Sequence, residues 1–147
     1  MSSAKKAGVG VASALGIALI VATFAFSCGH FDNGLFEVKQ TDWSQSGQVA
    51  MLAERSDHQA LRSDEYFVLI GDHVFSPTEL RDAFYGRREV FSAAGDCLSV
   101  RWSAARNLTV SCRDGSLDAS HINLQRRRTR DVTITYVNIP DINRGKK

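Results

Sequence analysis

Two histidines in this chain directly follow an aspartate, as Asp57-His58 and Asp72-His73. Imidazole and carboxylate groups serve as metal ligands and as acid–base pairs, so these positions are the first candidates for chemistry. They flank an expected strand at 65–71, which is roughly 23 Å long at ~3.3 Å per residue. The two pairs should therefore lie at opposite edges of the sheet unless the loop 56–64 folds back, and we predict no metal site.

The motifs that mark common enzyme classes are missing from the sequence. It holds no serine nucleophile elbow, no glycine-rich phosphate loop, no His-Glu zinc helix and no Cys-x-x-Cys pair. His30 and His121 have no identifiable partner in the sequence. We therefore predict no catalytic residue and no cofactor. A hydrolase stays an alternative only if a cleft joins His58 or His73 to a carboxylate.

The first 28 residues differ in composition from the rest of the chain. Lys5 and Lys6 precede residues 7–27, a stretch of 21 residues without a charge, a proline or an amide side chain. At 1.5 Å per residue, a helix of that length covers about 30 Å, the thickness of a bilayer core. Residues 1–28 are therefore predicted to be a membrane anchor. Cleavage as a signal sequence after Ser27 and lipidation at Cys28 are the alternatives.

All three fates place the remainder of the chain outside the cytoplasm. Lys5, Lys6 and the α-amine precede the span and only Lys39 follows it closely, so the N-terminus is expected in the cytoplasm. The sequence AFSC at 25–28 resembles a bacterial lipobox, which implies lipidation of Cys28. We expect a connector at 29–34, an exported domain at 35–140 and a disordered tail at 141–147.

Charge divides the exported part into two halves. Residues 29–85 carry 4 basic and 10 acidic groups, whereas residues 86–147 carry 12 basic and 6 acidic groups. We expect the two halves to pair across one sheet, with a bipolar docking surface as the alternative. One basic run is present and comprises Arg126, Arg127, Arg128 and Arg130. It is predicted to be a solvated edge or a patch for an acidic protein or anionic lipid headgroups, and nucleic acid is not expected outside the cytoplasm.

The elements that position these residues follow from local patterns. Strands are expected at 35–43, 48–55, 65–71, 88–93, 97–103, 107–113 and 131–140, whereas 116–124 is ambiguous. Residues 66–70 are apolar without alternation, which is typical of a central strand covered on both faces. Ser76, Pro77 and Glu79 form a capping signature that predicts a helix at about 77–85, with Gly86 ending it in the left-handed conformation.

Two stretches of the sequence share a tryptophan pattern. Trp43 and Trp102 are each followed by serine and then by apolar residues at +6, +8 and +10, and these stretches resemble the hairpins of TolB-type propellers. A propeller needs at least four blades of about 40 residues, and only 119 residues (29–147) follow Cys28. We therefore expect two similar hairpins whose tryptophans are core anchors, with ligand stacking as the alternative.

Cys97 and Cys112 begin and end the second hairpin, and export would place both thiols in an oxidising compartment. We predict that they form a disulfide. A corner centred on residues 104 and 105 sets them directly opposite each other. The alternating apolar face instead favours a register centred on Ala105, which leaves Cys97 on the other face unless a bulge at 95–96 intervenes.

These elements together predict the α+β class: an N-terminal transmembrane helix followed by a small antiparallel sheet domain with one capped helix. The chain resembles small membrane-anchored proteins of bacteria, which implies a single-pass location in the cell membrane and no particular activity. Because catalytic motifs are missing, we expect a non-catalytic binding or accessory role in the cell envelope. An envelope inhibitor or immunity-type protein is the first alternative, and a hydrolase with an unrecognised site is the second.

Overall fold

The computed structural model describes residues 34–57 and 64–143. The predicted anchor with Cys28, and also His30 and His58, lie outside these ranges. Within them, no helix has the length and apolar character that crossing a membrane requires.

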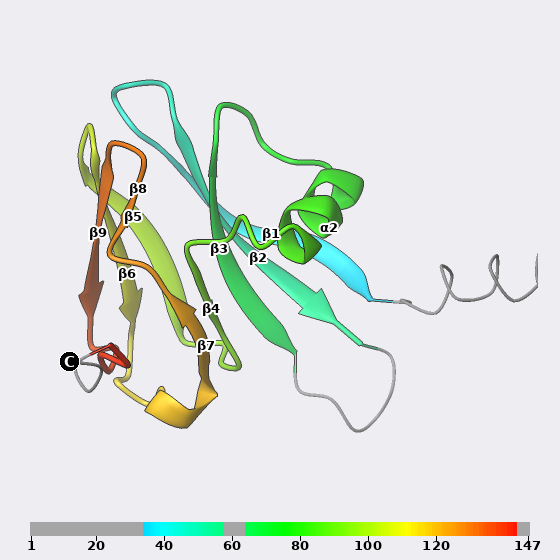
Figure 1. The fold of residues 1–147 in the computed structure, drawn as a ribbon, viewed down its shortest axis with the longest axis vertical. Coiled ribbons are helices and arrows are strands. Elements are labelled where there is room, and N and C mark those ends of the chain that lie inside the picture. Colours follow the sequence, from blue (N-terminus) through cyan, green and yellow to red (C-terminus); the bar gives the residue numbers. More distant parts are fainter. Residues whose placement is uncertain (1–33, 58–63, 144–147) are drawn as a thin grey trace, which may run out of the picture. The chain divides into compact units, whose positions relative to one another are not determined.

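The described residues form two sheets, which we call sheet A and sheet B (Figure 1). Sheet A contains β1 (Leu35–Trp43), β2 (Val49–Ser56), β3 (Glu65–Gly71), β4 (Phe91–Ala93) and β7 (Ile122–Gln125), in the order β1-β2-β3-β4-β7. Sheet B contains β5 (Leu98–Ala104), β6 (Asn107–Cys112), β8 (Arg128–Thr129) and β9 (Val132–Val137), in the order β5-β6-β9-β8. Helix α2 covers Pro77–Tyr85, and the short 3-10 turn η1 covers Ala119–His121.

The predicted α+β class is wrong, because strands dominate the fold. Against nine strands, α2 is the single α-helix in the ranges that the structure describes. Sheet B is also not antiparallel throughout, since β6 and β9 run parallel. The ambiguous segment 116–124 proves to hold η1 and the beginning of β7. Local sequence patterns predict the individual strands. The division of these strands between two sheets depends on pairings between distant segments, which such patterns do not contain.

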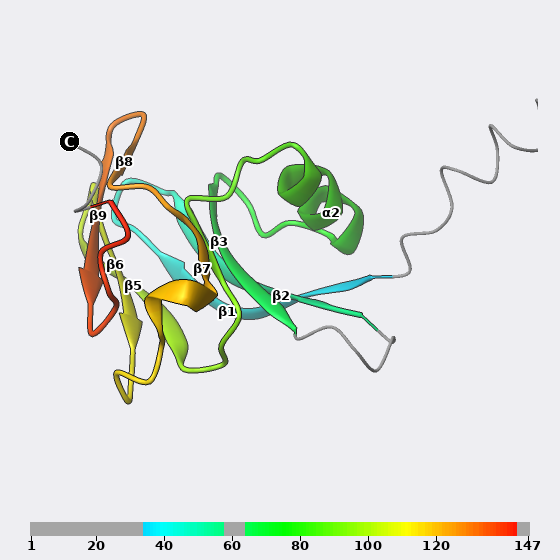
Figure 2. The same ribbon diagram turned by 60° about the horizontal axis from the view of Figure 1, so that its bottom comes forward.

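The central strands β2 and β3 of sheet A are covered on both faces, and their side chains point alternately to one face and the other. One face meets sheet B across a core that includes Ala50, Leu52, Val68, Val100, Leu108, Val110 and Ile134. Helix α2 covers the other face, where Met51, Phe67, Leu69, Leu80 and Ala83 pack together (Figure 2). Strand β3 is therefore central and covered on both sides, as its unbroken apolar run predicts.

Helix α2 begins with the predicted capping box. The Ser76 hydroxyl accepts from the Glu79 backbone N–H, and the Glu79 carboxylate accepts from the Ser76 N–H at 2.8 Å. The C-terminal end differs from the prediction, because Gly86 has a φ of −75° and Arg87 takes the left-handed conformation with a φ of 53°. The Gly86 N–H still bonds to the Asp82 carbonyl at 2.9 Å, so Gly86 completes the last turn and the reversal falls on Arg87.

The edge of β1 meets the edge of β5 through side chains. The Gln40 amide donates to the Val100 carbonyl at 2.9 Å and accepts from the Val100 N–H at 3.1 Å. The Asp42 carboxylate accepts from the Trp102 N–H at 2.6 Å. These two side chains of β1 thus bind peptide groups of β5 as a neighbouring strand would.

The two tryptophans have different surroundings. Trp102 packs against the core between the sheets and donates its indole N–H to the Asp42 carbonyl at 3.0 Å. Trp43 is 53% exposed, so its prediction as a core anchor is wrong. It pairs with Val49 at the end of β1, which is an edge strand of sheet A. An edge position leaves a large side chain only half covered.

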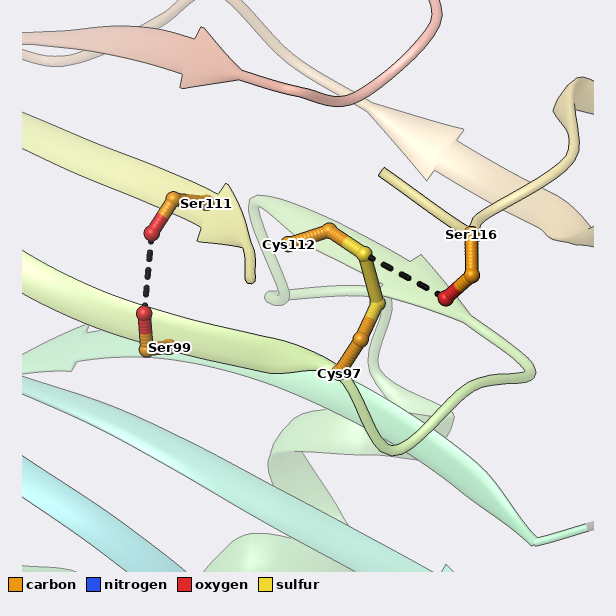
Figure 3. Close-up of a disulfide and its surroundings, with 5 residues drawn as sticks. All are labelled: Cys97, Ser99, Ser111, Cys112 and Ser116. Carbon is orange, nitrogen blue, oxygen red and sulfur yellow. Dashed lines mark hydrogen bonds between the residues drawn. A yellow bond between two sulfur atoms is a disulfide. The ribbon is translucent and has the colours of Figure 1, made fainter. Parts of the chain in front are cut away.

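Cys97 and Cys112 form the predicted disulfide (Figure 3). The hairpin has the alternating register, with Leu98 opposite Cys112 and Val100 opposite Val110. Cys97 precedes β5 in a turn, so the alternation of the strand does not fix its direction. It therefore reaches Cys112 diagonally, with the two Cα atoms 4.8 Å apart.

Candidate anion-binding groove

A groove of about 600 Å³ lies across the end of β3, between α2 and the β8–β9 turn. Figure 1 shows the loop after β3 and the β8–β9 turn at the same end of the two sheets. The apolar side chains of the lining include Leu69, Phe75, Val90 and Val132. The polar side chains are Arg87, Arg88, Arg126, Arg130, Asp72, Glu79, Asp82, Asp131, Gln48, His73 and Thr129.

Backbone contacts bring Arg126 next to the segment that follows α2. Its N–H donates to the Val90 carbonyl at 2.9 Å, and its guanidinium donates to the Arg87 carbonyl at 2.8 Å. The Tyr136 hydroxyl donates to the Arg126 carbonyl at 2.5 Å, and burial raises the pKa of this phenol, which keeps it a donor. Arginines 39 residues apart in the sequence therefore line one groove.

The four groove arginines, Arg87, Arg88, Arg126 and Arg130, have no carboxylate partner among the described residues. Two of the four acids in the lining, Asp72 and Glu79, bind His73, and a third, Asp131, pairs with Arg106 at 3.4 Å. Arg88 lies over the ring of Phe75, 5.6 Å from its centroid. The guanidiniums thus keep donors that an anion could satisfy.

His73 is held between two carboxylates at the start of α2. Its Nδ1 lies 2.6 Å from Asp72 Oδ1 and its Nε2 lies 2.9 Å from Glu79 Oε1. These bonds, led by the one to Glu79, raise the pKa of His73. The Ser76 backbone N–H and His73 in turn lower the pKa of Glu79 to about 2. Both ring nitrogens therefore lie within hydrogen-bond distance of a carboxylate, an arrangement that favours the protonated ring.

Gln48 contributes a polar atom of a different kind. Its side-chain Oε1 is buried without a hydrogen-bond partner in the described part of the chain. Its backbone N–H donates to the Ser44 hydroxyl at 3.1 Å, which fixes the residue at the end of the β1–β2 turn. The lining thus includes a residue with an unused hydrogen-bond acceptor.

The predicted basic run is divided by the structure. Arg126 and Arg130 line the groove, whereas Arg128 is exposed outside it. Arg127 pairs with Asp141 instead. Ile142 and Asn143 belong to the predicted disordered tail, but both are anchored on buried Gln125, to which the Ile142 N–H donates at 3.0 Å and the Asn143 side chain at 2.9 Å.

Sequence reasoning missed Arg87, Arg88 and Glu79 as groove residues. The pair Arg87-Arg88 directly follows the predicted helix, but nothing local in the sequence links it to the run 39 residues later. The sequence identifies Glu79 as a capping residue, but it does not show that its second oxygen also binds His73. Among the described residues, no group of three or more His, Cys, Asp or Glu side chains could hold a metal ion.

The two charge halves do not pair with each other through ion pairs in the described ranges. Every ion pair there joins residues of the same half, as Lys39 with Glu54 at 2.6 Å and Arg106 with Asp131 at 3.4 Å illustrate. The two halves are expected to pair across one sheet, but no ion pair between them is seen in the described ranges. The four groove arginines therefore have no carboxylate partner from either half in the described ranges.

Comparison of the chain with protein-family models, curated proteins and solved structures finds no match. The chemistry of the groove itself therefore has to indicate the function.

Proposed function

We propose that this chain is a non-catalytic binding or accessory protein whose groove holds an anionic ligand. The observation that carries the proposal is the set of four arginines without carboxylate partners in the described ranges, around one groove of about 600 Å³. Guanidinium groups bind carboxylates and phosphates through paired hydrogen bonds. A bound anion would supply the acceptors that the described part of the chain does not.

A hydrolase centred on His73 is the second candidate, because the groove joins this histidine to Asp72 and Glu79. A general base needs a free ring nitrogen within reach of the substrate. Both nitrogens of His73 are already hydrogen-bonded to carboxylates, and Thr129 is the one hydroxyl residue among the residues that line the groove. The arrangement therefore favours binding over catalysis.

The test compares Arg88→Gln with Arg128→Gln in the detergent-solubilised full chain. Arg88 lines the groove and contacts the Phe75 ring, whereas Arg128 lies outside the groove. We expect inorganic phosphate to raise the melting temperature of the wild type and of Arg128→Gln, and to raise that of Arg88→Gln much less. Equal shifts in all three proteins would contradict the proposal. An acidic protein that co-purifies with the wild type and not with Arg88→Gln would favour the inhibitor alternative.

We also propose that the groove lies outside the cytoplasm, on a domain that residues 1–28 hold at the bacterial cell membrane. The support is the apolar stretch 7–27 together with the Cys97–Cys112 disulfide, since such bonds are typical of exported proteins. The chain should fractionate with membranes and resist carbonate extraction. Recovery in the soluble fraction without residues 1–27 would indicate a cleaved signal. Loss of acyl labelling in Cys28→Ser would identify a lipoprotein.

A further inference from the structure

Three non-glycine residues in the described ranges have a positive φ: Arg87 at 53°, Arg130 at 48° and Asn138 at 56°. Asparagine adopts this left-handed conformation more readily than other residues with a side chain, whereas arginine has no such tendency. Asn138 therefore suits its position. The two arginines do not, and both of them line the groove.

The two positions lie on separate elements of the groove wall. Arg87 follows the last turn of α2. Arg130 begins the two-residue turn between Thr129 and Val132, a place where hairpins favour glycine or asparagine. Backbone outliers of this kind cluster at ligand sites, where the side chain is needed despite the conformation. The presence of arginine at both positions thus indicates that the two guanidinium groups have a role in the groove.

We infer that Arg87 and Arg130 together hold a phosphate group of the ligand, an inference that rests on the proposed function. The two guanidiniums have no carboxylate partner in the ranges that the structure describes, and they suit a compact group with more than one negative charge. A phosphate monoester carries about −1.5 to −2 charges and three acceptor oxygens, whereas a carboxylate carries one charge. The planar fork of arginine matches these oxygens in pairs. The same phosphate chemistry occurs in soluble esters and in phospholipid headgroups.

The groove also accommodates the molecule that carries the phosphate. Its volume of about 600 Å³ lies in the range of small-molecule sites. The lining also holds the uncharged polar side chains of Gln48 and Thr129, which can hydrogen-bond to ligand hydroxyls. We therefore choose glycerol 3-phosphate as the soluble probe, because it combines a phosphate monoester with two hydroxyls. Vesicles that contain phosphatidic acid present the corresponding lipid.

The test measures affinity and melting temperature together in the detergent-solubilised full chain. We expect Arg87→Asn and Arg130→Asn each to weaken the binding of glycerol 3-phosphate at least ten-fold. We expect their melting temperatures to be unchanged or higher, because asparagine accepts the left-handed backbone. Arg128→Asn, in the same basic run but outside the groove, should keep the wild-type affinity. Acetate should bind the wild type at least ten-fold more weakly than glycerol 3-phosphate.

Arg87→Lys provides a second variant, because Arg87 follows the C-terminal end of a helix, where any cation is favourable. Lysine keeps the charge and loses the paired hydrogen bonds, so the affinity should still fall. A lower melting temperature for Arg130→Asn would show that its guanidinium supports the fold instead, and would overturn the inference. Wild-type affinity in both asparagine variants would also overturn it.

The arms of the experiment separate this inference from the proposed function. If phosphate and acetate bind equally well in the groove, the phosphate inference fails and anion binding stands. If no anion binds and Arg88→Gln has no effect, both fail. Tighter binding to vesicles with phosphatidic acid than to glycerol 3-phosphate supports a lipid source of the phosphate, and the reverse supports a soluble ester. Release of inorganic phosphate from the probe would overturn the binding role in favour of a hydrolase.

Discussion

His73 links protonation to stability, because it donates to Asp72 and Glu79 in the folded protein. Its pKa is raised above the ordinary 6.5, so this contribution is full below pH 6.5 and is lost as the pH rises through the folded pKa. The pKa of Glu79 falls from 4.5 to about 2, so its contribution is present above pH 4.5 and is lost as the pH falls toward 2. The interaction between His73 and Glu79 therefore stabilises the folded protein most between about pH 4.5 and pH 6.5.

His73→Gln should therefore lower the melting temperature most at about pH 5.5 and least at about pH 9. Thermal melts of both proteins at several pH values measure this difference. An effect of His73→Gln that is equal at both pH values would contradict the assignment.

Trp43 and Trp102 offer a second contrast between single residues. Trp102→Ala should lower the free energy of unfolding by up to about 3–5 kcal/mol, because a large, partly buried side chain that packs against the core is lost. Trp43→Ala should change it by about 0.5 kcal/mol or less, because this side chain is half exposed. Urea denaturation of the two variants measures both values. Similar losses would mean that Trp43 is covered in the folded protein.

The sequence could not separate these tryptophans, because their flanking patterns are alike. Exposure depends on whether the strand lies at a sheet edge, and that follows from the pairing order. The groove could not be predicted either, because it too depends on the order in which the strands pair. The basic run predicted a patch, but Arg87 and Arg126 meet only because β4 pairs with β7.

Among the elements, α2 was predictable because its signals are local. The cap, the first-turn proline and the apolar stripe lie within about three turns of helix. The parallel pairing of β6 with β9 was not predictable, since 19 residues separate the end of one strand from the start of the other (113–131). Local patterns identify strands, whereas their partners depend on packing across the whole core.

The junction between β1 and β5 can be tested by hydrogen exchange. In Gln40→Ala, the backbone amide of Val100 loses its acceptor, and its exchange should become faster. Loss of a part-buried hydrogen bond should also cost about 1–3 kcal/mol. Thr41→Ala, at the next position of β1 and exposed, is the control. Unchanged protection of Val100 in Gln40→Ala would show that this bond does not hold the junction.

At the scale of the whole molecule, the disulfide limits the freedom of the unfolded chain. Cys97 and Cys112 are 15 residues apart, and closing such a loop contributes about 3 kcal/mol. Replacing both by alanine should lower the free energy of unfolding by about that amount. A reductant should have the same effect on the wild type and none on the double variant. Rapid alkylation of both thiols in the folded wild type without reductant would contradict the bond.

The side-chain junction also has a consequence for solubility. An edge strand with free peptide groups is a template on which a strand of another molecule can add, and such addition leads to aggregates. Gln40 and Asp42 bind the Val100 peptide groups and the Trp102 N–H on the outer edge of β5, so a second chain cannot pair there. These two side chains therefore block the addition of a strand from a second copy at this edge, and they also link the two sheets. Loss of both should appear first as oligomers in size-exclusion chromatography at high protein concentration.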